Sequence, residues 1–413
     1  MSLAIKSVQR VRQFCFNTRL ACGIGLLLLE TNANAHLFFI STTLDTTNTE
    51  SLRGAVIAAS ATDEKNTIVL PQNAFPLSIY SPGAEPGYSA GLVVTRGNLV
   101  IRGNPEAAIT ASGLVGWGYA DNCVIHILPG ARVRLENLIL TGGTGFGGGI
   151  DNEGTLELVD CVVTGNTSFA YAGGGGIRNS GTLTMTGCIV STNSTGINYS
   201  GNGGGIYNSG DLQIRRSLIY GNTTRNAPDG GFDDGWGIII IWGPQAPLPG
   251  WPGESAGDGG AIYNSGALSI VDCAIFRNTC GSGGNGTDGF NAVGGDGGDG
   301  GNGGGIYTAG TMVIERCKIQ NNSCGSGGNG GNGTGFPQGG TGGKGGSGGG
   351  IFNAGLALQA LLIRTEVTLN SAGEGGRSGN DGALGAFGSG EEIFGPVTIQ
   401  KHEPPPGRGL EQP

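Results

Sequence analysis

The chain has 413 residues, of which 87 are glycine and 17 are proline. Glycine is therefore about three times as frequent as in an average protein, where its share is about 7%. Charged residues make up only 13% and the net charge is −9 without a basic cluster, which excludes a charge-rich disordered chain, a coiled coil and a nucleic-acid partner.

Residues 1–35 have the three parts of a secretory signal peptide. Basic residues precede an apolar run over residues 20–29, and Ala33-Asn34-Ala35 offers a small-residue cleavage site. The basic residues are Lys6, Arg10, Arg12 and Arg19. The apolar run is too short to span a membrane, and no later stretch is long enough either. The sequence thus predicts a secreted or peripherally attached chain whose mature part has no transmembrane segment; the alternative is a cytosolic N-terminal helix.

A short helix is expected over residues 51–61. Ser51 is a suitable N-cap, and Leu52, Ala55, Val56 and Ala59 fall on one helical face. An open strand edge at the end of a sheet has to be covered, because its unpaired backbone groups invite aggregation. We therefore predict an N-terminal cap over residues 36–95, with this helix as its central element.

One sequence unit recurs along the rest of the chain. Each copy has an isoleucine, Asn or Thr two residues later, then Gly, then alternating apolar residues; the copies open at Ile150, Ile177, Ile206, Ile262, Ile306 and Ile351. Alternation predicts short strands, and the glycines predict turns. One unit cannot bury its own apolar face, so the units must stack into a parallel β-solenoid. The predicted solenoid covers residues 96–375, and residues 376–413 form a C-terminal tail.

Two polar positions repeat from unit to unit. The first is predicted to form a ladder of stacked amides: Asn152, Asn179, Asn208, Asn264 and Asn353, with Thr308 once. The second contains Asn166, Asn193, Asn222, Asn278 and Asn322. Its first three members stand in glycosylation sequons, and a turn ladder is favoured over glycosylation for them.

Cysteines also repeat. Cys161, Cys188, Cys273 and Cys317 share one position and are predicted to lie in the core. Cys280 and Cys324 occupy matching segments of neighbouring coils, where a disulfide between them is a candidate staple. No Cys-x-x-Cys pair exists and only His36, His126 and His402 remain, so no metal site is expected.

The insertion at residues 223–257 holds the candidate ligand-binding residues. It contains Trp236, Trp242 and Trp251 together with Asp233 and Asp234. Exposed indoles in a long loop can stack on sugar rings or dock on a protein. The alternative is that the loop folds down and covers one face of the solenoid. Adjacent aspartates on a strand point to opposite faces, so no catalytic residue is predicted.

Two glycine-rich segments follow. Residues 283–291 match the nonapeptide calcium pattern Gly-Gly-x-Gly-x-Asp-x-U-x once, so calcium is a candidate ligand and otherwise no cofactor is expected. The alternative is a solvated loop rich in Gly, Asn and Asp. The Gly-Gly-x triplets at residues 325–350 are predicted to be long flexible loops between coils.

The repeats resemble those of chlamydial polymorphic outer-membrane proteins. Gly259-Gly260-Ala261-Ile262 and Ile275-Phe276-Arg277-Asn278 carry this resemblance. Residues 51–56 (Ser-Leu-Arg-Gly-Ala-Val) are similar to the Cys-Ser-Leu-Arg-Glu-Ala segment of bacterial secreted β-helix proteins, with Glu50 in place of Cys and Gly54 in place of Glu. The resemblance implies an all-β, right-handed parallel β-helix and export, and it implies little about activity.

Two functions follow from these observations. The first is a non-enzymatic surface or matrix protein that presents loops from a β-helix for adhesion or envelope structure. The second is a carbohydrate-active protein, either a polysaccharide binder or a lyase or hydrolase, that uses the loop at residues 223–257. The expected partners are a polysaccharide or a cell-surface protein. The first is favoured because no complete catalytic constellation is visible, and the tryptophans are the argument for the second.

Overall fold

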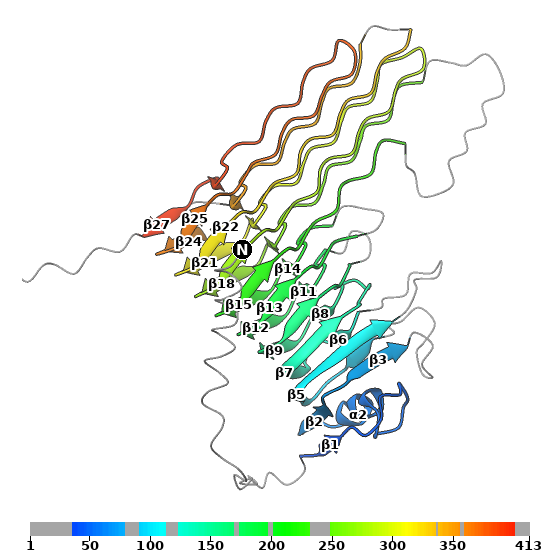
Figure 1. The fold of residues 1–413 in the computed structure, drawn as a ribbon, viewed down its shortest axis with the longest axis vertical. Coiled ribbons are helices and arrows are strands. Elements are labelled where there is room, and N and C mark those ends of the chain that lie inside the picture. Colours follow the sequence, from blue (N-terminus) through cyan, green and yellow to red (C-terminus); the bar gives the residue numbers. More distant parts are fainter. Residues whose placement is uncertain are drawn as a thin grey trace, which may run out of the picture. The chain divides into compact units, whose positions relative to one another are not determined.

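A computed structural model describes residues 35–78, 91–112, 123–168, 173–196, 201–231, 248–335, 338–355 and 359–400. The chain divides into residues 1–35 and residues 36–413. The second unit is a right-handed parallel β-helix, which confirms the predicted fold class (Figure 1). The predicted signal peptide lies almost wholly outside the described residues. None of the helices in the described part has the length and apolar character of a membrane span.

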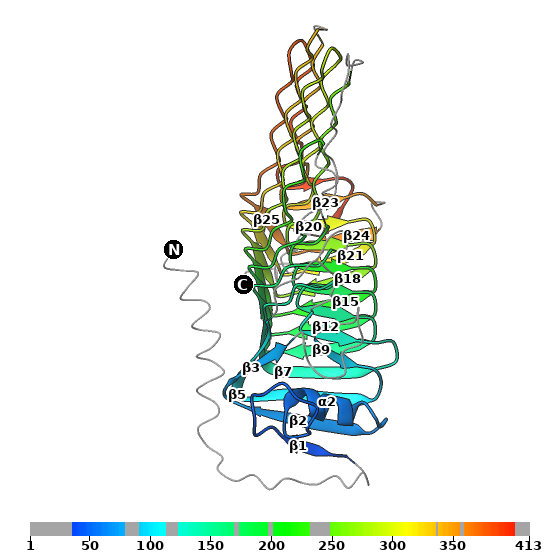
Figure 2. The same cartoon turned by 90° about the vertical axis from the view of Figure 1, so that its right-hand side faces the viewer.

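The predicted N-terminal helix is present as α2 (Leu52–Ala59). Ser51 caps it by accepting a hydrogen bond from the Gly54 N–H at 3.2 Å, and the apolar side of the helix is buried. A Cβ on Gly54 would lie 2.0 Å from the Asn48 carbonyl oxygen, which explains why a larger residue is absent there. The helix packs against β2 (Lys65–Pro71) and β4 (Leu92–Val94) at the first coils (Figure 2).

Each regular coil contributes three short strands, and strands of successive coils pair in parallel. In the described part these form an 18-stranded and a nine-stranded sheet. The nine-stranded sheet, called the Ile-x-Asn sheet below, consists of β4 and of β6 (Ile125–Ile127), β8 (Ile150–Asn152), β11 (Ile177–Asn179), β14 (Ile206–Asn208), β17 (Ile262–Asn264), β20 (Ile306–Thr308), β23 (Ile351–Asn353) and β26 (Ile393–Phe394).

The 18-stranded sheet contains two ladders that are joined by long strands near its N-terminal end. The joining strands are β5 (Asn98–Ser112) and β7 (Arg132–Thr141), with β1 (Leu37–Phe39), β2 and β3 (Ala74–Ser78) beside them. One ladder consists of β9 (Thr155–Val159), β12 (Thr182–Thr186), β15 (Asp211–Arg215), β18 (Ala267–Val271), β21 (Thr311–Glu315), β24 (Ala360–Ile363) and β27 (Thr398–Gln400). The other consists of β10 (Val162–Thr164), β13 (Ile189–Ser191), β16 (Leu218–Tyr220), β19 (Ala274–Phe276), β22 (Lys318–Gln320) and β25 (Glu366–Thr368).

The coils extend beyond both predicted limits of the solenoid. β26 pairs with β23 and β27 pairs with β24, although both strands lie in the stretch predicted to be a tail. At the other end, β2 lies in the region predicted to be a cap and pairs in parallel with β5 of the predicted solenoid. β26 and β27 are short and carry few apolar residues, and β2 has alternating buried residues but lacks the Ile-x-Asn triplet of the repeat.

The core is a continuous apolar column inside the coils. Register places like on like: Ile177 lies beside Ile206, and Leu183 beside Leu212. Alternate residues of the strands face inward and are fully buried, which is the period that the sequence showed. The cysteine column belongs to this core, as predicted. Burial raises the pKa of the Cys188 thiol to about 11, and its Sγ donates to the Leu158 carbonyl.

The first asparagine ladder is largely as predicted. The Nδ2 of Asn152 donates to Asn179 Oδ1 at 2.6 Å, and the next steps reach Asn208 and Asn264 at 2.7 Å each. Asn264 then donates to Thr308 Oγ1 at 2.9 Å. Asn353 differs, because it donates to the Pro396 carbonyl and accepts from the Gly355 N–H instead.

The second column is a buried turn ladder, as favoured above. Asn166, Asn193, Asn222, Asn278, Asn322 and Asn370 follow one another, with side-chain amide bonds of 2.9–3.0 Å between successive members. All six are buried. Glycosylation of the three sequon asparagines would require these amides to leave the interior.

The predicted Cys280–Cys324 disulfide is wrong, because both thiols are free and buried. The Sγ of Cys280 donates to the Asn302 carbonyl at 3.2 Å, and the Sγ of Cys324 donates to the Ser347 carbonyl at 3.1 Å. Each thiol therefore bonds within its own loop instead of facing the other sulfur. Burial raises the pKa of Cys324 to about 12, so this thiol is a weak nucleophile.

Four long loops leave the coils on the same side and extend together away from the strands (Figure 1). We call them the glycine bundle. Its outward arms are residues 225–231, 280–289, 324–335 and 372–381, and its return arms are residues 248–258, 293–302, 338–347 and 382–390. The prediction of flexible loops at residues 325–350 is wrong, because a regular network of backbone hydrogen bonds joins each arm to its neighbours.

The network has a period of three residues. In the triplet Gly327-Gly328-Asn329, the first glycine N–H donates to Glu374 in the next outward arm, and the second donates to Gly298 in a return arm. The Asn329 N–H donates to Asn285 Oδ1 of the previous loop at 2.8 Å. A three-residue repeat whose hydrogen bonds all go to other segments is the pattern of packed polyproline II strands.

Glycine is required in the bundle because the arms touch. A Cβ on Gly328 would lie 1.9 Å from the Gly284 carbonyl oxygen, and one on Gly343 would lie 1.9 Å from that of Gly298. Apart from the small buried side chains of Ala227, Cys280 and Cys324 near its base, the interior between the two layers of arms is therefore formed by glycine backbone. Every third residue points outward and carries an amide, hydroxyl or charged group along most of each arm.

Candidate functional site

The outer face of the Ile-x-Asn sheet carries one column of side chains, the middle residue of each strand. Register aligns His126 with Asp151, Asp151 with Arg178, and Arg178 with Tyr207. The column continues through Tyr263, Tyr307, Phe352 and Phe394. It thus changes from charged to aromatic halfway along the stacked coils.

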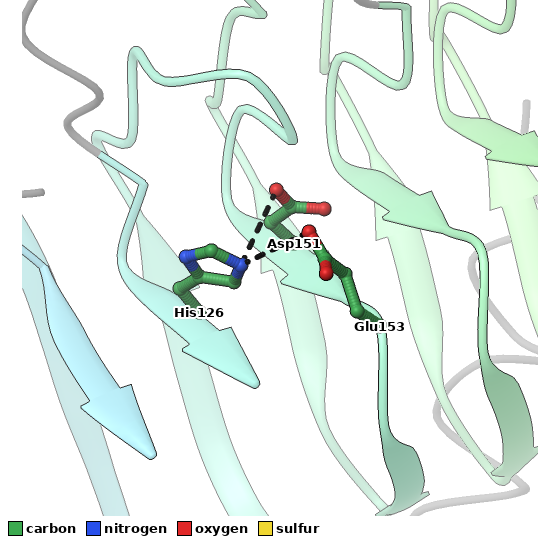
Figure 3. A group of neighbouring side chains, drawn as sticks. All are labelled: His126, Asp151 and Glu153. Atoms are coloured by element: carbon green, nitrogen blue, oxygen red, sulfur yellow. Dashed lines mark hydrogen bonds and ion pairs between the residues drawn. The ribbon is translucent and has the colours of Figure 1, made fainter. Parts of the chain in front are cut away.

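Two residues of the charged part of the column, His126 and Asp151, form a compact group with Glu153, which follows β8 (Figure 3). We call His126, Asp151 and Glu153 the His126 cluster. The Nε2 of His126 lies 3.4 Å from Glu153 Oε1 and 3.7 Å from Asp151 Oδ2. The Asp151 side chain is only 3% exposed, whereas those of His126 and Glu153 are 18% and 33% exposed.

Local structure holds the three ligand atoms in place. His126 and Asp151 are directly paired residues of β6 and β8, and the Glu153 N–H donates to the Ile127 carbonyl at 2.9 Å. Nη1 of Arg178 contacts both carboxylate oxygens of Asp151 at 3.0 Å from the next strand. The buried carboxylate is therefore fixed from one side, while the imidazole and Glu153 remain accessible.

This arrangement has two chemical capacities. All three ligand atoms lie within 4.8 Å of one another, and in the searched part of the chain this is the group of His, Cys, Asp and Glu side chains that could hold a metal ion. An imidazole beside carboxylates can also transfer protons at neutral pH. The sequence-based expectation of no metal ligand set did not anticipate this cluster.

The aromatic part of the column is a stack. Ring centroids of Tyr207, Tyr263, Tyr307, Phe352 and Phe394 follow one another at 4.9–5.2 Å. Burial, together with the neighbouring tyrosines, raises the pKa of Tyr263 to about 12, so its phenol stays protonated at physiological pH. Because the faces of successive rings cover one another, the inner rings of the stack present edges and hydroxyls to a ligand.

The predicted tryptophan site is described only in part. Trp251 lies in the first return arm with 60% of its surface exposed, while Trp236, Trp242, Asp233 and Asp234 lie outside the described residues. Leu248 exchanges two backbone hydrogen bonds of 2.9 Å with Phe290, and both residues are exposed. The described part of the loop therefore joins the glycine bundle and presents apolar groups to solvent.

Asp288 of the predicted calcium segment and two later aspartates of the same loop, Asp296 and Asp299, have structural partners. Asp288 Oδ1 accepts from the Asn332 N–H at 2.6 Å, Asp296 Oδ1 from the Thr341 N–H at 2.7 Å, and Asp299 Oδ1 from the Lys344 N–H at 2.7 Å. Each carboxylate thus links one loop to the next. These residues do not form a metal-ligand group in the searched part of the chain, and calcium binding there stays a prediction.

The sequence contained a signal for the outer column that was not used. The middle residue of each Ile-x-Asn triplet reads Asp, Arg, Tyr, Tyr, then Phe when the copies are aligned, with Tyr307 in the Ile-x-Thr copy. Arg178 and the tyrosines could have been found in this way. His126 could not, because its strand has the sequence Ile-His-Ile and lies outside the repeat.

No protein-family model and no curated protein sequence matches the chain. Among solved structures, the chain is similar to the A-module of the mannuronan C-5 epimerase from Azotobacter vinelandii. The identity is 13%, the match covers 86% of this chain and 94% of that chain, and the TM-score is 0.31. A likeness at this level carries no argument about activity.

Proposed function

We propose that this chain is an exported, non-enzymatic surface or matrix protein that presents the glycine bundle for adhesion. The observation that carries the proposal is the construction of the bundle. Arms from four successive loops are joined by backbone hydrogen bonds into one ordered body. Long ordered loops that extend outside the coils provide an exposed surface for a partner, which is a more direct role for them than enclosing a pocket.

The exposed groups of the bundle suit a hydroxyl-rich partner such as a polysaccharide. The outward-pointing residues include Asn285, Asp288, Asn329 and Asn332. In polyproline II geometry they repeat about every 9 Å along an arm, so they form a regular grid of hydrogen-bonding groups. Exposed Trp251 adds an indole at the edge of the first loop.

Affinity electrophoresis of the purified chain on a panel of neutral and anionic polysaccharides tests this function. We expect retardation by at least one polysaccharide without new reducing or unsaturated chain ends. Changing Trp236, Trp242 and Trp251 to Ala should weaken the retardation. The matched control is Phe387→Ala, which removes an exposed aromatic residue from the last return arm. The absence of retardation on every polysaccharide would contradict polysaccharide adhesion.

A second function is favoured by one observation, the His126 cluster. An accessible imidazole next to two carboxylates, with Arg178 to hold an anionic group, has the elements of acid–base catalysis on a charged sugar. This carbohydrate-active alternative predicts new chain ends or a change in sugar composition in the same assay. Loss of these products in His126→Asn would replace the adhesive proposal with the enzymatic one.

A further inference from the structure

We propose that His126, Asp151 and Glu153 form a binding site for a divalent transition-metal ion, with Zn²⁺ as the ion that their chemistry fits best. The inference does not depend on the adhesive function. It rests on the geometry of three side chains that come from two adjacent coils. Nothing in the sequence brings His126 and Glu153 together, since 27 residues separate them.

The distances fit ligands that share a cation better than they fit hydrogen bonds. Two atoms that each lie about 2.0–2.1 Å from a tetrahedral zinc ion are roughly 3.4 Å apart. The separations of His126 Nε2 from Glu153 Oε1 and Asp151 Oδ2 are 3.4 and 3.7 Å. A charge-assisted N–H···O bond would be about 2.7–2.9 Å, so the imidazole nitrogen lies between two carboxylates without a close bond to either.

The donor set points to zinc. One imidazole nitrogen and two carboxylate oxygens are ligands that Zn²⁺ accepts, whereas calcium prefers sites with oxygen ligands only. Three protein ligands leave a coordination position for a water molecule or for an oxygen atom of a bound partner. His126 and Glu153 are partly exposed, so an ion can reach the site from solvent.

The surroundings of the site are those of an ordered ligand set. Asp151 is held by Arg178, which fixes the orientation of the carboxylate by donating to both of its oxygens. The guanidinium also places a positive charge next to the site. Two carboxylates balance the charge of a divalent ion, so Arg178 leaves a surplus of one positive charge and weakens the site.

Calorimetric titration of ZnCl₂ into the purified full chain tests the proposal. We expect one zinc site whose affinity falls at least ~100-fold in His126→Asn and in Glu153→Gln, because the loss of a direct ligand exceeds the loss of an outer partner. The matched controls are His36→Asn and Glu157→Gln, a histidine and a glutamate outside the cluster, and both should leave the affinity unchanged. Arg178→Gln should increase the affinity several-fold.

A second measurement distinguishes this site from the cysteines. Co²⁺ bound to nitrogen and oxygen ligands gives d–d absorption without the strong thiolate charge-transfer band, and thermal melting of each variant without metal shows whether it is folded. The proposal is overturned if the wild-type chain binds no Zn²⁺, if folded His126→Asn binds it as tightly as the wild type, or if the Co²⁺ spectrum contains the thiolate band.

Discussion

The coils and the glycine bundle belong to one chain and stack in the same direction, but different groups fill their interiors. The coils bury a column of side chains, among them Ile214, Ile270 and Leu212, each at most 1% exposed. The bundle buries the backbone of glycines such as Gly328 and Gly343. In the strands of the coils, backbone ladder bonds are combined with the hydrophobic burial of every second side chain, whereas the bundle relies mainly on hydrogen bonds and close backbone contact.

This difference predicts unequal stability. Glycine loses more conformational entropy on folding than any other residue, and the bundle buries only a few small apolar side chains, such as Cys280 and Cys324, to offset that loss. Its arms are therefore expected to open at a lower free energy than the strands that carry them. The bundle also depends on the coils, because the stacking of the strands sets the spacing at which the arms meet.

The largest local effect is expected from filling the bundle interior. In Gly328→Val the new Cβ would lie 1.9 Å from the Gly284 carbonyl oxygen and 2.5 Å from the Gly284 carbonyl carbon. The arm that contains Gly284 cannot move away by itself, because backbone hydrogen bonds join it to its neighbours. We expect a loss of more than about 4 kcal/mol in the local stability of the arms. Hydrogen exchange should show fast amides in the arms and unchanged protection in β18 and β21. Protected arms in the variant would show that the bundle tolerates side chains in its interior.

The converse experiment removes part of the apolar core. Ile270→Ala leaves a cavity in β18, and we expect a loss of about 2–5 kcal/mol in the free energy of unfolding. Thermal melting should then show coils and bundle unfolding at a lower temperature together. Ser269→Ala, on the outward side of the same strand, is the matched control and should shift the melting temperature little. A bundle that stays protected while the coils unfold would contradict its dependence on them.

A substitution in the buried turn ladder should lower the free energy of unfolding by an intermediate amount. Asn222 Nδ2 donates to Asn278 Oδ1 and to the Val190 carbonyl at 3.0 Å each, and Asn222 Oδ1 accepts from the Asn193 N–H at 3.1 Å. Asn222→Ala leaves these buried partners unsatisfied, so we expect a loss of about 3 kcal/mol measured by urea unfolding. A loss below about 1 kcal/mol would indicate that water replaces the amide.

Sequence predicted the coils well because side-chain direction in a strand follows the sequence with a period of two. The inward positions of β12 and β15, the asparagine ladders and the helix face of α2 could all be derived in this way. Ordering of the glycine bundle could not, because the reason for each glycine is a contact with another loop. Gly328, for example, meets Gly284 and donates to Gly298, and neither relation leaves a local pattern.

The candidate site was missed for a related reason. Asp151 and Glu153 belong to a regular repeat, but His126 lies in a coil without the Ile-x-Asn pattern, so only the register of β6 on β8 brings them together. The predicted disulfide failed because repeat position was taken as proximity of sulfur atoms. Equivalent residues of stacked coils share a direction, and Cys280 and Cys324 therefore bond to carbonyls of their own loops.

Each outward-pointing side chain of the bundle should contribute a small amount to the local stability of the arms. Asn329 Oδ1 accepts from the Arg377 N–H at 2.9 Å, so Asn329→Ala removes one link between two loops at an exposed position. We expect about 1 kcal/mol of lost local protection, visible as faster hydrogen exchange at the Arg377 amide. Asn329→Asp keeps an acceptor oxygen and should preserve most of the protection. Equal exchange in wild type and Asn329→Ala would show that these side chains do not link the loops.

The smallest effect concerns Asp258 at the base of the bundle, where burial raises the pKa of the carboxyl although Asn302 donates to it from its N–H at 2.7 Å. A folded-state pKa above the unfolded one means that ionisation is penalised in the folded state. The penalty is absent below the ordinary carboxyl range, grows as the pH rises above about 4, and is complete above the folded-state pKa.

Asp258→Asn keeps the acceptor oxygen and removes the charge, so the variant should melt higher than the wild type at pH 7 and equally at pH 3. Asp299→Asn is the matched control, because Asp299 makes the same bond to the Lys344 N–H from an exposed position. For Asp299→Asn we expect no pH-dependent gain in melting temperature over the wild type. A gain at pH 7 in both variants would indicate that the net negative charge of the chain, and not burial at the base of the bundle, opposes folding of the arms.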